Sequence, residues 1–204
     1  MNIWLATFNP GKIREFQSLF DPKQFNFQIA KDVSSYSAPA EDGQTFEDNA
    51  KIKAESLFAV LNSKEVVISE DSGLVVEGLN NYPGIFSARY AGPTATDLQN
   101  NDKVLKMLKL RSPNNRKAKF VSCIYLKSPE FEICTLGEVQ GEISMSMKGQ
   151  TGFGYDPIFI PEGYSQTMSE LGLAVKNKIS HRKKSVQMLK DQLIDKRPDW
   201  FNIG

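Results

Sequence analysis

Apolar and polar residues recur along the chain with two different periods, which predicts a mixture of strands and helices. Alternating or continuous apolar runs predict strands at residues 3–6, 25–30, 66–71, 116–127 and 131–142. Apolar residues at helical spacing predict helices over 13–20, 45–61, 97–109 and 184–195. The strand at 116–127 has apolar residues on both faces, which indicates a central position in the sheet. The pattern therefore predicts an α/β fold with a mixed sheet.

The strand predicted at 66–71 ends in an acidic pair. Val66 to Ile68 is an apolar run, and Glu70 and Asp71 follow it directly, before Ser72 and a glycine. In open α/β sheets ligands bind outside the carboxyl ends of strands, where carboxylates can hold a hard cation or activate water. The alternative is a plain turn, because Asp, Ser and Gly all favour turns.

A polar loop follows the first predicted strand and leads into the first helix. A helix N-terminus presents backbone N–H groups to an anion, and Lys12 adds a positive charge there. The loop is not a P-loop, because Ala6 and Ile13 occupy positions where that motif needs Gly and Ser or Thr. Phosphate binding and a tight turn with a solvated lysine both fit the segment.

A lysine lies on the apolar face of the helix predicted at 45–61. Thr45 and Asp48 form a capping-box pattern at its start, and Lys53 shares a face with Phe46 and Leu57. Such a lysine either extends its ammonium group to water or meets a carboxylate or phosphate in a cleft. Glu41, just before this helix, is a candidate partner.

Two further polar segments lie in the second half of the chain. The loop at 152–157 surrounds Phe153 with glycines, so it either offers a flat ring to a base or forms a glycine bulge with a core aromatic. Lys176 and the basic run at 180–184 come where the last helix is expected to begin. Cations oppose the helix dipole at that end, so the run indicates either an anionic or carbonyl-rich ligand or a solvated basic face.

Composition narrows the function classes. The chain has 204 residues with 25 basic and 24 acidic ones, so a general nucleic-acid binder, which needs a large positive field, is not expected. No apolar run is long enough to span a membrane and no signal peptide is recognisable, which predicts a cytoplasmic protein. Cys123 and Cys134 are expected to be reduced, although a hairpin would bring them together. The single histidine, His181, excludes a multi-histidine zinc site within one chain, so any metal is expected to have oxygen ligands.

Taken in order, six blocks of the chain resemble the non-canonical purine nucleoside triphosphate pyrophosphatases, also called inosine triphosphate or dITP/XTP pyrophosphatases. The blocks are residues 6–12 (ATFNPGK), 41–50 (EDGQTFEDNA) with Lys53, 70–74 (EDSGL), 83–92 (PGIFSARYAG), 152–157 (GFGYDP) and 179–182 (ISHR). The resemblance implies one domain over residues 1–204, an elongated two-lobed α/β fold with helices flanking a mixed sheet and an active-site cleft between the lobes, and a homodimer. It also implies Mg²⁺-dependent hydrolysis of ITP, dITP and XTP to the monophosphate and pyrophosphate, which keeps deaminated purines out of DNA and RNA.

The resemblance also assigns roles to residues. It implies that Asp71 is the general base and that Glu41, Glu70 and Asp71 form the metal site. The residues implied to bind the triphosphate are Thr7, Phe8, Asn9, Pro10, Gly11, Lys12 and Lys53. The residues implied to form the base pocket are Phe153, Gly154, Tyr155, Asp156, Lys176, His181 and Arg182, and Ser72 is implied to touch the substrate. Bacterial members commonly have an aspartate where this chain has Glu70. The glutamate keeps the charge but is one methylene longer, so the metal geometry at this position is expected to differ.

Two other functions remain open from the sequence. One is a related pyrophosphatase that prefers pyrimidine or modified nucleotides on the same architecture. The other is a catalytically silent nucleotide sensor or RNA-binding module that keeps the phosphate loop and the basic run. Glu41 and Asp71 argue against a pure binder, because carboxylates repel phosphate unless a metal intervenes.

Overall fold

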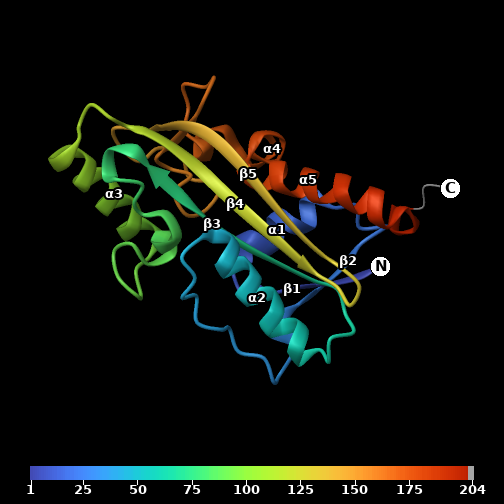
Figure 1. Cartoon of the computed structure of the whole chain (residues 1–204). Helices are drawn as coiled ribbons and strands as arrows, with labels where there is room; N and C mark the ends of the chain where they lie inside the picture. Colours follow the sequence, from blue (N-terminus) through green and yellow to red (C-terminus); the bar gives the residue numbers. More distant parts are fainter. Residues whose placement is uncertain (202–204) are drawn as a thin grey trace. The chain divides into compact units, whose positions relative to one another are not determined.

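The computed structural model describes residues 1–201 and contains the helices and strands that the hydrophobic pattern predicts (Figure 1). The strands are β1 (Asn2–Leu5), β2 (Asn26–Ile29), β3 (Val67–Val76), β4 (Lys117–Lys127), β5 (Glu132–Ile143) and β6 (Phe159–Pro161). The helices are α1 (Pro10–Leu19), α2 (Phe46–Val60), α3 (Asp97–Arg111), α4 (Met168–Ile179) and α5 (His181–Lys196), with 3₁₀ helices η1 (Ala30–Asp32), η2 (Glu77–Leu79), η3 (Gly84–Arg89) and η4 (Pro198–Phe201). The sequence pattern did not predict α4 and β6.

The strands form one mixed sheet in the order β2-β1-β3-β4-β5-β6. β1 pairs in parallel with both β2 and β3, whereas β5 and β6 are antiparallel. A tight turn joins β4 to β5, and the Ser128 N–H donates to the Phe131 carbonyl across it, which makes these two strands an antiparallel hairpin. The predicted mixed sheet with flanking helices and the central position of β4 are thus confirmed.

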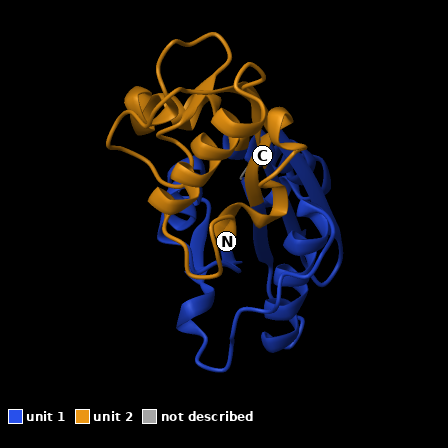
Figure 2. Ribbon diagram, turned by 90° about the vertical axis from the view of Figure 1, so that its left-hand side faces the viewer, with its two compact units in different colours: residues 1–71, 122–137, 182–204 blue, residues 72–121, 138–181 orange. Residues whose placement is uncertain are grey.

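The chain divides into two compact units (Figure 2). Unit 1 contains Met1–Asp71, Ser122–Gly137 and Arg182–Gly204, and unit 2 contains Ser72–Val121 and Glu138–His181. The boundaries fall inside β3, β4 and β5 and after the first residue of α5. Each unit is therefore built from segments that are distant in the sequence.

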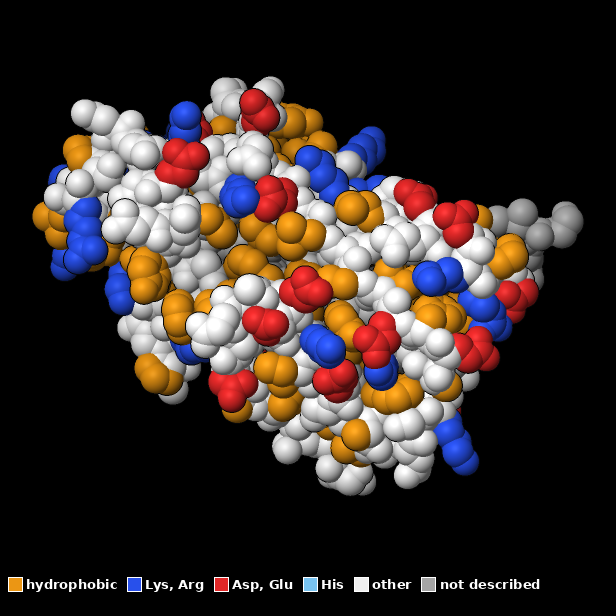
Figure 3. All heavy atoms as spheres, viewed as in Figure 1, with side chains coloured by type: hydrophobic (Ala, Val, Ile, Leu, Met, Phe, Trp, Pro, Cys, Tyr) orange, Lys and Arg blue, Asp and Glu red, His pale blue; other side chains and the backbone are white. Residues whose placement is uncertain are grey.

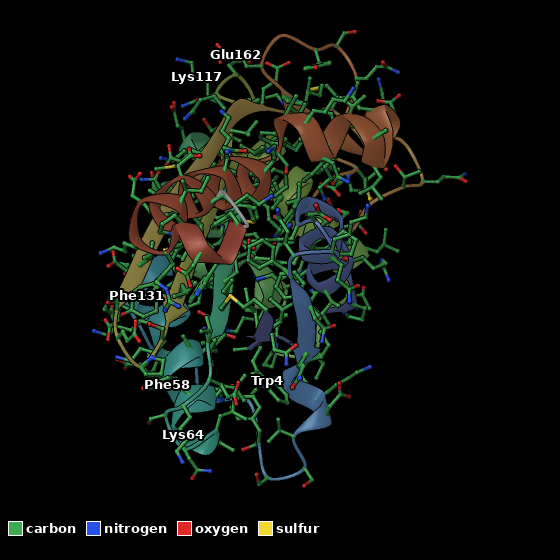
Figure 4. All side chains as sticks on the ribbon, turned by 90° about the vertical axis from the view of Figure 1, so that its right-hand side faces the viewer. Trp4, Phe58, Lys64, Lys117, Phe131 and Glu162 are labelled. Carbon is green, nitrogen blue, oxygen red and sulfur yellow. The ribbon has the colours of Figure 1, made fainter. Side chains whose placement is uncertain are left out.

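Two apolar clusters make up the core of unit 1. One contains Phe16 of α1 and Leu189 of α5 with Ile68 of β3. The other contains Ala54 and Phe58 of α2 with residues of β3 and β4, and Trp4 of β1 packs against its edge (Figure 4). The aromatic tail joins the first cluster, since Phe201 contacts Phe25 and Trp200 contacts Phe131. The C-terminal helical turn thus packs on its own subunit.

Unit 2 has its own core, in which α3 and α4 cover strand residues. Leu74 and Val76 of β3 pack with Leu108 of α3, Phe159 of β6 and Met168 of α4, and all five are buried. A polar groove of about 470 Å³ lies at the β5–β6 edge of this unit, with Lys117 and Glu162 on its rim (Figure 4). None of the predicted site residues lines this groove.

One feature of β3 corrects the interpretation of the acidic pair. The strand does not end at Glu70 and Asp71 but continues through Ser72 and Gly73 to Val76. The β-branched residues Val75 and Val76 extend the strand, so the Asp-Ser-Gly sequence forms no turn here. Glu70 and Asp71 consequently lie in the middle of a buried strand, one on each face of the sheet.

Charge is mixed on the face drawn in Figure 3, where acidic and basic side chains alternate with apolar ones. This agrees with the near balance of 25 basic and 24 acidic residues. Within the part of the chain that the structure describes, no helix has both the length and the apolar character needed to cross a membrane.

Candidate functional site

The phosphate loop lies in unit 1, between β1 and α1. Asn9 caps α1, and its side-chain oxygen accepts from the N–H groups of Gly11 at 2.8 Å and Lys12 at 3.1 Å. Two of the amides expected to face a phosphate are thus already paired with the cap. Phe8 stacks on Tyr36 with ring centres 5.9 Å apart, which ties this loop to the segment that carries Glu41.

Lys53 lies between two carboxylates. Its Nζ is 3.1 Å from Glu41 Oε2 and 3.0 Å from Asp71 Oδ1, and the residue is only 8% exposed. Asn49, one turn earlier on α2, donates to Asp71 Oδ2 at 3.4 Å. Of the two sequence interpretations of Lys53, the meeting with a carboxylate is confirmed. Sequence reasoning missed Asn49, although its position four residues before Lys53 puts it on the same helical face.

Burial and neighbouring charges shift the pKa values of Asp71, Glu41 and Lys53 in different directions. Burial raises the pKa of Asp71, and Lys53 offsets this only in part. Although burial opposes it, the charge and hydrogen bond of Lys53 lower the pKa of Glu41. The two carboxylates in turn raise the pKa of Lys53 against its own burial. Asp71 is therefore the carboxylate of this group that takes up a proton most readily, as a general base requires.

Glu70 points to the opposite face of β3, into a second charged cluster. Arg182 contacts both of its carboxylate oxygens, at 2.8 and 2.9 Å, and Lys12 Nζ lies 3.2 Å from Oε2. Ser122 donates to Oε1 at 2.7 Å. The other side of the Arg182 guanidinium pairs with Glu15 of α1. Every charged group of this cluster except Lys12 is almost fully buried.

These contacts shift the pKa values of Glu70 and Arg182 in opposite directions. Although burial opposes it, Arg182 and Lys12 hold the pKa of Glu70 well below its usual range. Two carboxylates likewise raise the pKa of Arg182 despite its burial. The guanidinium of Arg182 pairs with Glu15 and Glu70 of unit 1, and the Glu70 oxygens are themselves paired with Arg182 and Lys12. Sequence reasoning missed Glu15, because nothing local links it to a residue 167 positions away.

The predicted metal site can be compared with this arrangement. Among residues 1–201 no group of three or more His, Cys, Asp or Glu side chains is placed to hold a metal ion. Mg²⁺, however, usually binds through one or two carboxylates together with substrate phosphates. Glu41 and Asp71 converge on the same lysine and fit that requirement, whereas Glu70 does not.

The loop expected to contact the base lies in unit 2. Asp156 Oδ2 accepts from the Phe153 N–H at 3.0 Å and from Lys176 Nζ at 2.5 Å, and Lys176 Nζ lies 4.4 Å from the centre of the Phe153 ring. Gly152 is required next to them, since a Cβ at this position, where φ is +83°, would come within 2.1 Å of the Asp156 carboxylate. The structure thus brings Phe153, Asp156 and Lys176 together as predicted.

Other parts of unit 2 support this loop. The hydroxyl of Tyr155 donates to the Ser87 carbonyl at 2.8 Å, which connects the loop to the 83–92 block. Asp97 and Asn101 of α3 bind the backbone of Gly154 at 2.7 and 2.8 Å, a contact that sequence reasoning missed.

The remaining predicted residues, His181 and Ser72, also lie in unit 2. His181 stacks on Phe120 with ring centres 4.7 Å apart, and it is buried, like Arg182, its neighbour in the chain. Ser72 follows Asp71 in β3 and is half-buried. The consecutive residues His181 and Arg182 thus enter different surroundings, an aromatic one in unit 2 and a carboxylate cluster in unit 1.

A protein-family model, named proteins and solved structures all match this chain over nearly its whole length. The model of the Ham1 family matches residues 3–192. A Bdellovibrio bacteriovorus protein named dITP/XTP pyrophosphatase is 47% identical over 95% of this chain and 98% of its own length. A Bacillus anthracis protein of the same name is 40% identical over 97% of this chain and 96% of its own. A Staphylococcus aureus Ham1 protein structure superposes with a TM-score of 0.84 at 37% identity, covering 97% of this chain and all of that one.

Proposed function

Because the chain belongs to the Ham1 family, we infer that it is a nucleoside triphosphate pyrophosphatase, as its named relatives are. Its substrates are non-canonical purine nucleoside triphosphates such as ITP, dITP and XTP, which it cleaves to the monophosphate and pyrophosphate. Removing these nucleotides keeps deaminated purines out of DNA and RNA. The observation that carries the chemical proposal is the buried Lys53 with Glu41 and Asp71 on either side.

We propose that Asp71 is the general base. The pKa of Asp71 is raised, and Lys53 compensates only part of its charge, so the carboxylate can accept a proton from the attacking water. The water oxygen then bonds to the α phosphorus, and the bond to the bridging oxygen breaks so that pyrophosphate leaves. Asn49 and Lys53 fix the orientation of the Asp71 carboxylate.

Glu41 and Asp71 are the residues proposed to hold Mg²⁺. A bound Mg²⁺ would supply positive charge to the phosphate oxygens as negative charge develops on the leaving group. The proposed triphosphate contacts are Thr7, Phe8, Asn9, Pro10, Gly11, Lys12 and Lys53. Lys12 and Lys53 contribute the same kind of stabilisation from the chain itself.

We assign base recognition to the 152–157 loop of unit 2 and to the buried Lys176–Asp156 ion pair. The Phe153 ring offers a flat surface to a purine. Lys176 and His181 supply donors that suit the 6-keto oxygen of hypoxanthine and xanthine, whereas adenine presents a donor there. An unpaired buried polar group costs about 1–3 kcal/mol, which corresponds to roughly 5- to 150-fold selectivity. The further proposed contacts are Ser72, Gly154, Tyr155 and Asp156, while Arg182 positions Glu70 and Glu15 instead.

The resemblance also supports a homodimer in the cytoplasm. Light scattering of the purified chain tests the oligomer directly, and a single species with the mass of one chain would exclude the dimer.

A substrate panel tests the activity. We expect ITP, dITP and XTP to release pyrophosphate with Mg²⁺ and none to do so with EDTA. Faster release from dTTP or UTP would favour a pyrimidine-preferring enzyme, and no release from any nucleotide would favour a sensor. Orthophosphate as the direct product would contradict attack at the α phosphorus. Lys53→Met is expected to abolish most activity, and Lys51→Met, on the exposed face of the same helix, is its control.

A further inference from the structure

Two thiols that the proposed reaction does not use lie side by side in unit 1. Cys123 of β4 and Cys134 of β5 are both free, and their Sγ atoms are 3.4 Å apart. Cys123 is completely buried, whereas Cys134 is half-buried and faces the start of α2. A small reagent therefore reaches Cys134 first, and Cys123 is the nearest nucleophile to the product.

The strand register brings the two Sγ atoms into contact without the backbone geometry of a relaxed disulfide. Hydrogen bonds from Ser128 to Phe131 and from Ile143 to Arg116, at the two ends of the hairpin, place Tyr125 opposite Cys134. Cys123 is thus the diagonal neighbour of Cys134, and diagonal Cα atoms are about 7–8 Å apart. A relaxed disulfide needs Cα atoms within about 6.8 Å, so closing this pair requires the two strands to shift.

Such a strand shift would disturb hydrogen bonds on the other face of the β4–β5 hairpin. Ser122, next to Cys123, donates to Glu70 at 2.7 Å and contacts the Ser185 hydroxyl of α5 at 2.9 Å. Thr135, next to Cys134, donates to the Ser185 carbonyl at 3.0 Å. One residue of α5 therefore holds both strands, and sliding one strand past the other strains the hydrogen bonds that fix the Glu70 cluster.

We propose that Cys123 and Cys134 form a reversible oxidation site for peroxides, coupled through β4 and β5 to the Glu70–Arg182 cluster. The Cys134 thiolate attacks a peroxide oxygen, the O–O bond breaks, and a sulfenic acid forms with release of water or an alcohol. The Cys123 sulfur then attacks the sulfenic sulfur, the S–O bond breaks, and a second water leaves with the Cys123 proton. The two thiols lose two electrons, and the peroxide is reduced.

The modification is tested by treating the reduced chain with hydrogen peroxide, alkylating it and digesting it with trypsin. Trypsin cuts after Lys127, so Cys123 and Cys134 fall on different peptides that stay joined only by a disulfide. We expect the joined peptides after oxidation, their separation by dithiothreitol, and no joined species from Cys134→Ser. Full alkylation of both thiols, stable oxygen adducts without a cross-link, or a disulfide only between two chains would each overturn the site.

The coupling is tested on the same samples by the rate of pyrophosphate release from ITP, and this arm rests on the proposed function. Oxidised wild type is expected to lose most of its rate and to regain it with dithiothreitol, while Cys134→Ser keeps its rate throughout. An oxidised, cross-linked chain with an unchanged rate would overturn the coupling. If the reduced wild type releases no pyrophosphate, the proposed function is refuted instead. The coupling is then tested by thermal unfolding of the reduced and oxidised chains, and equal midpoints would overturn the coupling.

Discussion

Replacing Arg182 distinguishes its two possible roles. In Arg182→Met, Glu15 loses its buried cationic partner, and Glu70 keeps only Lys12 and Ser122. Removing one member of a buried ion pair typically costs about 3–5 kcal/mol, because the remaining charge stays buried and unpaired. Since Lys12 still compensates Glu70, we expect a loss near the lower end of that range.

The assay is thermal unfolding followed by circular dichroism. For a chain of this size each kcal/mol lowers the midpoint by about 2–4 °C, so a fall on the order of 10 °C is expected. The control is Arg197→Met, whose exposed ion pairs with Glu130 and Asp199 are expected to contribute almost nothing. Adding Glu15→Gln to Arg182→Met should recover part of the loss.

The pH dependence of this difference gives a second check. The lowered pKa of Glu70 means that its contribution to wild-type stability is present above the unfolded value of about 4.5 and is lost as pH falls. In Arg182→Met, protonation of the buried Glu15 and Glu70 carboxylates removes their uncompensated negative charge. The difference in unfolding midpoint between wild type and variant should therefore become smaller from pH 8 to pH 5. An unchanged midpoint together with an altered ITP-to-ATP preference would show that Arg182 contacts the base and that the carboxylate cluster is not its main role.

The remaining predictions concern catalysis and recognition. Asp71→Asn should lower kcat on ITP by about 10²-fold or more while circular dichroism stays unchanged, and near-normal kcat would exclude Asp71 as the base. Because burial raises the pKa of Asp71, kcat/KM should fall with decreasing pH at a midpoint above 3.8, and a midpoint at or below that value would contradict the assignment. Glu41→Gln should raise the Mg²⁺ concentration for half-maximal rate, and an unchanged Mg²⁺ titration would remove Glu41 from the metal site. Lys176→Met should narrow the preference for ITP over ATP, whereas Lys178→Met, on the exposed face of α4, should not; equal kcat/KM ratios in both variants would place base recognition elsewhere.

Features that depend on neighbouring residues were predictable from the sequence. The capping box of Thr45 and Asp48 forms as expected at the start of α2, because both hydrogen bonds lie within one turn. The helical position of Lys53 on an apolar face left two surroundings open, water or a carboxylate or phosphate partner, and the structure shows two carboxylates. Apolar residues on both faces of β4 likewise gave its central position.

Other features depend on contacts that a local pattern does not contain. Helix α4 escaped prediction because Gly172, with φ of +77°, interrupts it and its buried Lys176 breaks the apolar stripe. The continuation of β3 past Asp71 was missed because Ser72 and Gly73 favour turns in isolation, whereas their neighbours in the sheet hold them extended. The destination of Arg182 depends on Glu70, 112 residues away, so no local spacing could reveal it.

The balance of buried charge in unit 1 explains why a divalent cation suits this site. Within residues 1–201 the two clusters on β3 contain four carboxylates and three cations, namely Glu15, Glu41, Glu70 and Asp71 with Lys12, Lys53 and Arg182. The excess negative charge falls on the Lys53 group, because Glu15 and Glu70 are matched by Arg182 and Lys12. The raised pKa of Asp71 reflects its burial and, to a smaller extent, the nearby charge of Glu41. A triphosphate would add more negative charge beside these carboxylates, so productive binding requires added positive charge at Glu41 and Asp71.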